Sequence, residues 1–406
     1  MRTFLRILSH FTLIGFKPNP EVSCPADKYN NQFSFISLIV LQKIKFINSL
    51  IIIIIPLIKE IKMKQGLPLI KINAKNNEEF GYKLGKALKT QIQTRLEKNK
   101  IIYWKNSRNK EDFSVLIKKS KKFLPAIKKY FPHLLIEAEA MAHGAGVPFE
   151  ELFVLMCENE VVDFKILHCT SIAIRTDEGK ILIGHNEDWF PEYRKEGIVL
   201  IKGKINKNKF ITSSFIGSMV GSSVGLNSKG IVYTDNSFLF TRLSPGVPRS
   251  FHLRALLDAK NPAHAIKILG TEGTTVTNTL LAWSDKSFMD IEELWKTEEV
   301  FLGDKFLVHT NHPLLKKYNR KYNVPHDSIR RYNHAIKILE NEKKLTINSV
   351  KKVLTNHDGG ICDHEMNPHS KYYPPTIASY IINPKDKWIM ACSGNPCKNK
   401  YKKYYL

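Results

Sequence analysis

Hydrophobic residues follow a helical spacing in the first part of the chain and a strand spacing later. Between 78 and 98 an apolar residue recurs every fourth position, which predicts an amphipathic helix. The same reasoning predicts three more helices, at 111–129, 134–143 and 149–162. Glycines at 144 and 146 form a stop signal for the third of them. After a short strand at 66–72, the segment up to residue 168 is therefore expected to be mostly helical.

After residue 168 the pattern changes to short apolar runs between turn residues. Two such runs, 171–176 and 181–184, flank an Asp-Glu-Gly-Lys turn and predict a β-hairpin. Further strands are expected at 197–203, 209–217, 223–226, 231–234, 277–283, 306–309, 376–382 and 388–391. Later helices are expected at 250–257, 263–269, 328–339 and 347–354. Antiparallel hairpins in blocks separate from helices favour an α+β fold over a doubly wound parallel sheet.

Composition narrows the class of protein. Lys and Arg number 62 against 38 Asp and Glu, a net charge of +24, but the lysines are scattered and no zinc-finger or RNP-like motif accompanies them. We therefore expect no nucleic-acid partner. Six cysteines in 406 residues are too sparse for a disulfide framework, so a reducing, cytoplasmic location is the default expectation. Cys392 and Cys397 flank a turn, and a single disulfide between these two cysteines remains an alternative.

Residues 1–62 do not share the regular pattern that begins at Met63. The apolar run 48–58 is too short to span a bilayer, and lysines at 43 and 45 interrupt the wider run 33–58. Three interpretations remain: a membrane anchor, a disordered extension, or translated sequence upstream of a start at Met63. We favour the third, so that 1–62 would not be part of the fold, and membrane contact is expected only if this segment is present.

Cys169 opens the predicted hairpin among hydroxyl residues. Cysteine is nucleophilic as the thiolate and needs a base, yet the adjacent His168 would point to the opposite face of a strand. Cleavage between His168 and Cys169 would give the nucleophile its own α-amine, whose pKa of about 7.7–8.0 suits a general base. The thiol could itself attack the His168 carbonyl to form a thioester that water opens. The simpler alternative is that Cys169 is a small buried hydrophobic residue.

A resemblance to a known family bears on this choice. Several separated segments occur in order: HCTSIAI, GHNEDW, GLNSKGIVYTDNS, VHTNHP, DSIRRY, HDGGICDH, TIASYI and SGNPC. From about Met63 to Tyr405 the chain resembles the isopenicillin-N acyltransferase-like family of self-cleaving N-terminal nucleophile hydrolases, which includes penicillin-forming acyltransferases and β-alanyl-dopamine hydrolases. The resemblance implies a four-layer αββα sandwich with antiparallel sheets. It also implies an amide hydrolase or acyltransferase that acts on a small amide, without a cofactor.

The resemblance further implies a cleavage site and a set of catalytic residues. Precursor cleavage would yield an α-chain, 63–168, and a β-chain, 169–406, that stay associated. Within the β-chain, Cys169 would be the nucleophile, and Asp188 would orient the new amine. Asn236 would help to form the oxyanion hole, Asn311 would be a second asparagine near the nucleophile, and Arg331 would be the arginine of the catalytic pocket.

Several assignments have competitors. Glu187 competes with Asp188, but its side chain should leave the strand from the opposite face, and Arg330 competes with Arg331. The family often has glycine before the nucleophile, where the backbone must distort; His168 either slows cleavage or assists it as a proton carrier. A pseudoenzyme that binds a small amide without cleaving itself remains an alternative to the enzyme.

One segment is rich in metal-ligand residue types. His357, Asp358, Cys362, Asp363, His364 and His369 lie close together in sequence, so a metal-dependent hydrolase is a further alternative. Their spacing matches no standard zinc motif, and the family resemblance includes this loop without needing a metal. We therefore expect a loop packed near the active site and no metal site.

Overall fold

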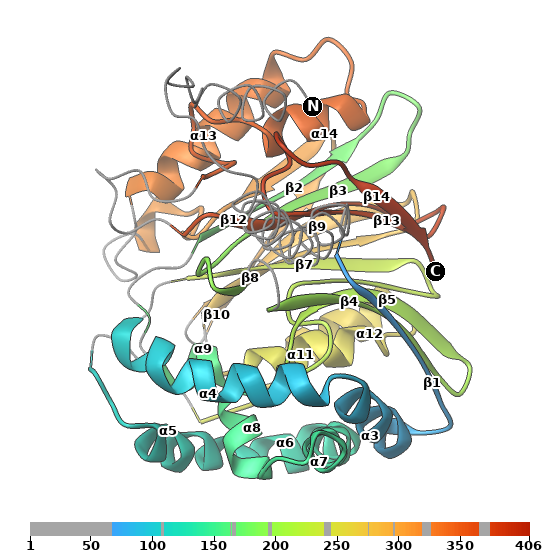
Figure 1. Ribbon diagram of the computed structural model, residues 1–406. Helices are drawn as coiled ribbons and strands as arrows, with labels where there is room; N and C mark the ends of the chain where they lie inside the picture. The colour runs from blue at the N-terminus through green and yellow to red at the C-terminus, as the bar shows by residue number, and fades with distance from the viewer. Residues whose placement is uncertain are drawn as a thin grey trace, which may run out of the picture. The chain divides into compact units, whose positions relative to one another are not determined.

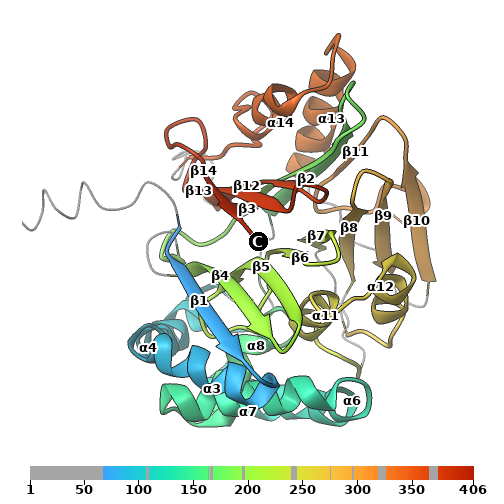
Figure 2. The same cartoon turned by 90° about the vertical axis from the view of Figure 1, so that its right-hand side faces the viewer.

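The computed structural model describes residues 67–406 except 107–108, 163, 165–167, 194–196, 239–244, 275, 295–296, 319–325 and 365–373. Its strands form two sheets that stack face to face, with helices on both outer sides (Figures 1 and 2). The predicted α+β sandwich of four layers is therefore confirmed. The expectations for residues 1–62 and for His369 lie outside the described residues.

Among the described residues, the larger sheet runs in the order β1-β4-β5-β6-β7-β8-β9-β10 and the smaller in the order β11-β2-β3-β12-β13-β14. The strands of the larger sheet are β1 (Leu69–Ala74), β4 (Ile198–Ile205), β5 (Asn208–Phe215), β6 (Val224–Asn227), β7 (Ile231–Ser237), β8 (Thr277–Trp283), β9 (Ser287–Leu294) and β10 (Thr297–Gly303). Those of the smaller are β11 (Phe306–His309), β2 (His168–Arg175), β3 (Ile181–Asp188), β12 (Thr376–Asn383), β13 (Trp388–Ser393) and β14 (Lys402–Tyr405). All pairs are antiparallel except β1 with β4, which departs from the expected all-antiparallel sheets.

The helices divide between the two outer layers. Two helices, α13 (His326–Glu340) and α14 (Ile347–Leu354), cover the smaller sheet (Figure 2). The larger sheet is covered by α3 (Asn77–Ala87), α4 (Lys89–Asn106), α5 (Phe113–Ser120), α6 (Leu124–Tyr130), α7 (Pro132–Ala145), α8 (Phe149–Met156), α9 (Glu158–Val161), α11 (Arg249–Leu256) and α12 (Pro262–Leu269). Among the described helices, none combines the length and hydropathy needed to cross a membrane.

Local sequence explains where several elements end. The β2–β3 hairpin turns at Gly179, whose φ of 76° is the left-handed conformation that glycine adopts without strain. Helix α7 ends at Gly146, also left-handed, which confirms the predicted helix stop. The predicted helix 78–98 is instead two helices that meet at Leu88. The apolar spacing continues through the break, so the sequence pattern alone indicates a single helix.

Three strands were not predicted: β9, β10 and β14. Two acidic pairs, Glu292–Glu293 and Glu298–Glu299, stand in β9 and β10, and strands are usually depleted in glutamate. In β9 the acidic side chains are buried, so pairing with β8 and β10 outweighs local propensity. The lysine-rich β14 is an edge strand, where charged side chains discourage pairing with other chains.

Helices α3 and α7 approach closely because glycines on each helix face the backbone of the other. A Cβ atom at Gly85 would lie 2.1 Å from the Met141 carbonyl oxygen, and one at Gly144 would lie 2.2 Å from the Tyr82 carbonyl oxygen. A methyl group therefore cannot be added at either position unless the helices separate. This contact packs α3 tightly against α7 within the helical layer.

Gly85→Ala should lower the free energy of unfolding by about 1–3 kcal/mol, the usual cost of overpacking. The gain in helix propensity, about 1 kcal/mol, offsets part of the clash. Urea denaturation followed by circular dichroism measures the change. Gly270→Ala is the matched control, because its nearest neighbour would be 3.5 Å away. Equal midpoints for the two variants would contradict the close approach.

Candidate active site

The β2–β3 register brings the start of β2 beside the end of β3. Cys169 pairs with Glu187, and His168 pairs with Asp188. The Cys169 thiol is buried and donates a hydrogen bond of 3.3 Å to Glu187 Oε1. The residue that pairs with Cys169 across the hairpin is therefore Glu187, on the same face of the sheet, whereas Asp188 lies beside the preceding residue.

The thiol is held in its neutral form in the continuous chain. Burial raises the pKa of Cys169 well above its usual range, and the nearby carboxylates of Glu187 and Asp188 act in the same direction. A neutral thiol is a poor nucleophile. Activation therefore requires a base that takes the proton during attack, or a change in the surroundings of the thiol.

Asn311 and Arg331, both predicted site residues, meet at the backbone of Cys169. The Cys169 N–H donates to Asn311 Oδ1 at 2.8 Å, and Arg331 Nη1 donates to the Cys169 carbonyl oxygen at 2.5 Å. Arg331 Nη2 also donates to Asn311 Oδ1 at 2.8 Å, which locks the two side chains together. Arg331 is fully buried on α13, whereas its competitor Arg330 is exposed on the same helix.

His168 lies between two buried carboxylates. Its Nδ1 is 3.3 Å from Asp188 Oδ2 and its Nε2 is 2.5 Å from Asp327 Oδ2. Burial alone would raise the pKa of Asp327, but its contacts with His168 and Arg331 outweigh burial and hold that pKa well below the usual range. Asp188 Oδ1 is buried and has no hydrogen-bond partner among the described residues, so it offers a vacant acceptor at the end of β3, where Asp188 pairs with His168.

Asn236 lies one layer away, on β7 of the larger sheet. Its Oδ1 accepts a short hydrogen bond from the Ser171 hydroxyl, and its Nδ2 donates to the His309 carbonyl oxygen at 3.3 Å. Ser171 in turn lies 2.9 Å from His185 Nδ1. Asn236 is therefore close to the start of β2 but contacts neither the thiol nor the backbone of Cys169 in this uncleaved chain. Its predicted role in an oxyanion hole stays a prediction.

A small cavity of about 40 Å³ opens at the thiol. That volume holds at most a few water molecules, well below the several hundred Å³ of a typical ligand pocket. His168, Cys169, Glu187 and Asn311 are all among its lining residues. His168, on the N-terminal side of the predicted scissile bond, thus lines the same cavity as Cys169.

The opposite wall of this cavity is acidic. Its charged residues are Glu158, Glu160, Asp235 and Arg249. Arg249 is neutralised by ion pairs of 2.6 Å to Asp235 and 2.7 Å to Glu293, and Glu158 pairs with Arg95 at 3.1 Å. Burial raises the pKa of Glu160 to about 7, although hydrogen bonds from the Arg249 backbone and Thr274 oppose this.

The sequence analysis did not predict two contacts of the site, although the sequence contains signals that indicate both. Counting outward from the Asp-Glu-Gly-Lys turn places Glu187 opposite Cys169, so the residue set aside as a competitor is the one that touches the thiol. Asp327 stands four residues before Arg331, the spacing of an ion pair on one helix face, and the pair is 3.3 Å apart.

Comparison with known proteins adds to this geometry. A sequence model of the family described as acyl-coenzyme A:6-aminopenicillanic acid acyl-transferase matches residues 174–398. The β-alanyl-dopamine/carcinine hydrolase of Drosophila melanogaster is 28% identical over 171 residues, 37% of this chain and 44% of the relative. The chain thus spans less than half the length of this curated relative.

Two solved structures also match the chain. The Caenorhabditis elegans ortholog of N-acylethanolamine-hydrolyzing acid amidase has a TM-score of 0.40 and 17% identity, covering 53% of this chain and 93% of that one. Penicillin V acylase from Agrobacterium tumefaciens has a TM-score of 0.44 and 15% identity, covering 59% of this chain and 86% of that one.

Proposed function

Because the chain belongs to the acyl-coenzyme A:6-aminopenicillanic acid acyl-transferase family, we propose that it is a self-cleaving amide hydrolase or acyltransferase with Cys169 as its nucleophile. One observation carries the proposal: the thiol, N–H and carbonyl of Cys169 are held by Glu187, Asn311 and Arg331 respectively. A buried N–H and C=O need partners at any residue, but at Cys169 both partners are side chains from elsewhere in the chain. A carboxylate also faces the thiol, which a cysteine that serves only as a small core residue does not need.

Self-cleavage begins with the Cys169 thiol. Sulfur attacks the His168 carbonyl carbon, and Glu187, 3.3 Å from the sulfur, takes the thiol proton. The proton passes to the departing Cys169 nitrogen, which becomes an α-amine as the C–N bond breaks. Water then opens the thioester and leaves a carboxylate on His168. That carboxylate forms close to Asp188 and Asp327, so charge repulsion would drive the new chain end away and open the cavity.

The mature site uses the new amine. Asn311 Oδ1 already accepts from the Cys169 nitrogen at 2.8 Å, and the vacant Asp188 Oδ1 supplies an anionic acceptor for the protons of an ammonium. An α-amine with a pKa near 7.7–8.0 can take the thiol proton at neutral pH. The thiolate then attacks the substrate amide carbon, the amine leaves, and water or a second amine takes the acyl group from the thioester.

The two fragments, 63–168 and 169–406, would remain associated after cleavage. Arg254 of the second fragment makes two hydrogen bonds of 2.8 Å to Glu137 of the first, and both side chains are buried. The main hydrophobic core includes residues of both fragments, such as Leu84 and Val232. Separating the fragments would expose this core and an ion pair that has no access to water.

The acidic wall favours a substrate that carries a positive charge. Arg249 and Glu158 are ion-paired, whereas Glu160 and Glu187 have no Lys or Arg ion-pair partner among the described residues and could pair with a cationic ligand. The Drosophila relative is named for β-alanyl-dopamine, and a β-alanyl group ends in an amine. We therefore propose small amides with an amino group on the acyl part as the substrate class.

Release of p-nitroaniline from acyl anilides tests this proposal. Purified protein should hydrolyse β-alanyl p-nitroanilide with a kcat/KM about tenfold above that for butanoyl p-nitroanilide, which replaces the ammonium with a methyl group; tenfold corresponds to about 1.4 kcal/mol. Since the pKa of Glu160 is raised to about 7, this carboxyl becomes neutral below that pH. The preference should therefore shrink as the pH falls from 8 to 6.

Glu160→Gln should reduce the same preference at pH 8, whereas Glu178→Gln, on the exposed hairpin turn, should leave it unchanged. Faster hydrolysis of the butanoyl compound would overturn the cationic substrate class alone. Failure of processed protein to release nitroaniline from any small anilide would contradict the enzyme itself.

A further inference from the structure

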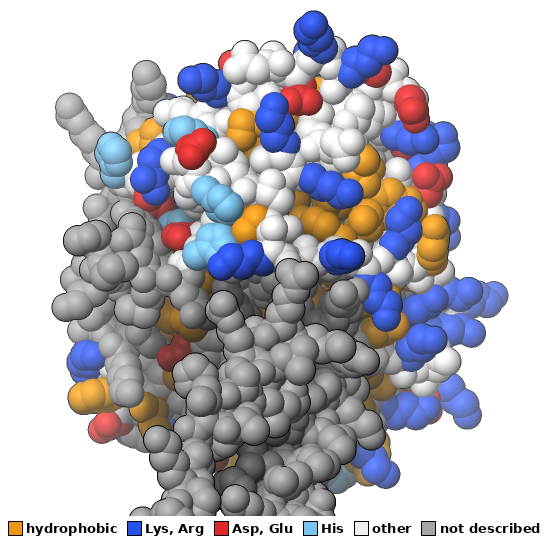
Figure 3. Space-filling model, turned by 45° about the horizontal axis from the view of Figure 1, so that its top comes forward, with side chains coloured by type: hydrophobic (Ala, Val, Ile, Leu, Met, Phe, Trp, Pro, Cys, Tyr) orange, Lys and Arg blue, Asp and Glu red, His pale blue; other side chains and the backbone are white. Residues whose placement is uncertain are grey.

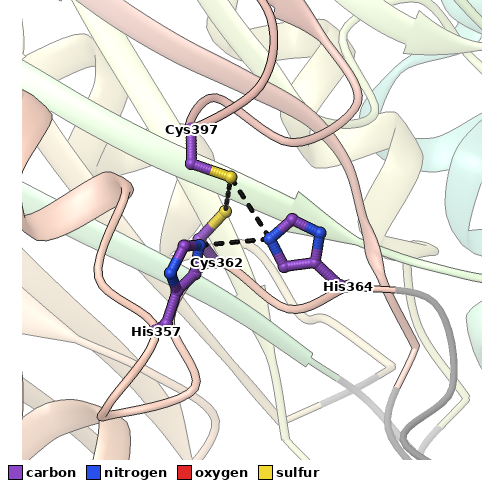
Figure 4. Close-up of side chains that lie close together, drawn as sticks. All are labelled: His357, Cys362, His364 and Cys397. Carbon is purple, nitrogen blue, oxygen red and sulfur yellow. Dashed lines mark hydrogen bonds between the residues drawn. The ribbon is translucent and has the colours of Figure 1, made fainter.

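Four metal-ligand side chains converge at the surface, outside the cavity described above. His357, Cys362 and His364 lie in the loop that follows α14, and Cys397 lies in the loop that follows β13. Their ligand atoms all lie within 4.8 Å of one another, and Figure 4 shows the four side chains pointing toward a common centre. On the face shown in Figure 3, histidine side chains gather close together.

Three of the six separations between these atoms match the edges of a tetrahedral shell, and all six are within 4.8 Å. The two sulfurs are 3.6 Å apart, Cys397 Sγ is 3.2 Å from His364 Nε2, and the Nε2 atoms of His364 and His357 are 3.1 Å apart. Zinc–sulfur and zinc–nitrogen bonds of about 2.3 and 2.0 Å place two sulfurs about 3.8 Å apart, two nitrogens about 3.3 Å apart and a mixed pair about 3.5 Å apart. Each observed edge is within a few tenths of an ångström of that shell.

Hydrogen bonds among the four side chains explain this arrangement poorly. Nε2 of His364 faces both Cys397 and His357, yet a ring nitrogen carries either one hydrogen or one lone pair and cannot serve two such contacts fully. Thiols are also weak donors and acceptors. A cation at the centre would satisfy all four atoms at once.

The surroundings hold the ligands in place. Asn395 Nδ2 donates to Cys362 Sγ at 3.6 Å and also to the Asp363 carbonyl oxygen, so it joins the two loops. The Cys362 N–H donates to the Asn356 carbonyl oxygen at 2.8 Å, and Gly360 turns the loop with a φ of 75°. Side-chain N–H groups that donate to ligating atoms are characteristic of the second layer of metal sites.

We propose that His357, Cys362, His364 and Cys397 bind one zinc ion as a structural site. Two thiolates and two imidazoles in a tetrahedral arrangement are the ligands that zinc prefers. The four protein ligands fill the coordination shell and leave no position for a substrate. The ion joins the loop that follows α14, and leads into β12, to the loop that follows β13. The first of these loops is held to β12 by two hydrogen bonds between Asp363 and Thr376, and Thr376 pairs with Asp188 of the candidate active site.

Metal analysis of the whole purified chain tests the site. Protein made without a histidine tag, in medium containing zinc, should contain about one zinc per chain by plasma mass spectrometry after gel filtration in metal-free buffer. Cys397→Ala and His357→Ala, both at exposed positions, should retain less than a tenth of that. Cys392→Ala is the matched control, since this cysteine lies on β13 outside the group and should keep the full amount.

Cobalt gives a readout that does not depend on the variants folding. Wild-type protein loaded with Co²⁺ should show the thiolate-to-cobalt charge-transfer and tetrahedral d–d absorption bands, and a chelator should lower its Tm. Wild type that binds neither metal after reduction and reloading would overturn the proposal. So would full zinc in Cys397→Ala, or a disulfide between Cys362 and Cys397 in protein purified under nitrogen.

Discussion

Purified wild-type protein should resolve into two polypeptides, the larger beginning at Cys169, whereas Cys169→Ala protein should remain a single chain. The substitution removes the sulfur that we propose attacks the His168 carbonyl. Amide hydrolysis should also fall by at least about a thousandfold, as is usual when a covalent nucleophile is removed. Intact mass spectrometry under denaturing conditions identifies both fragments, and native gel filtration should elute them together.

Cys157→Ala is the matched control for this experiment. Cys157 is also buried and also has a thiol pKa well above its usual range, but it lies on the helical layer away from the hairpin. The control should process fully, and its urea midpoint should match that of Cys169→Ala. Wild type that hydrolyses amides while its chain stays intact would contradict the N-terminal nucleophile mechanism, as would normal processing of Cys169→Ala.

Much of the site could be predicted because its residues occupy ordinary local structures. Alternating apolar residues and the Asp-Glu-Gly-Lys turn define the hairpin, and the hairpin alone sets what stands opposite Cys169. Asn311 and Arg331 were predicted from family segments far apart in the chain, and both contact the Cys169 backbone. Strand alternation places the side chains of Glu187 and Asp188 on opposite faces of the hairpin. The register of the hairpin then puts Glu187, not Asp188, on the same face as Cys169.

The remaining features depend on contacts that no local pattern encodes. The three ligands at 357–364 show no zinc motif because the fourth, Cys397, comes from a loop that the smaller sheet brings alongside. In the same way, strand β9 carries buried acidic residues that local propensity excludes from a strand. They are tolerated because partners such as Arg249 and His309 come from other elements. Sequence signals thus locate the proposed nucleophile, while tertiary packing decides which charges surround it.

Glu187→Gln should slow self-cleavage by about a hundredfold or more, within the usual range for loss of a general base. Glutamine keeps the size of the side chain, and its single amide oxygen can still accept the hydrogen bond from Ser223, so the fold should persist. Its amide cannot take the thiol proton, however, and the thiol is otherwise held neutral by burial. The rate is measured as the disappearance of full-length chain after synthesis in a cell-free system.

Asp188→Asn tests which of the two carboxylates at the end of the hairpin, Glu187 or Asp188, acts in self-cleavage. The Asp188 carboxylate contacts His168, whereas that of Glu187 contacts the thiol, so this variant should process far faster than Glu187→Gln but lose activity afterwards, when the new amine lacks its anionic acceptor. Glu178→Gln, on the exposed turn of the same hairpin, should match wild type in both measurements. If Glu187→Gln matured at the wild-type rate while Asp188→Asn stalled as full-length chain, the base in self-cleavage would have to be Asp188. The contact between Glu187 and the sulfur would then serve only to keep the precursor thiol protonated until cleavage begins.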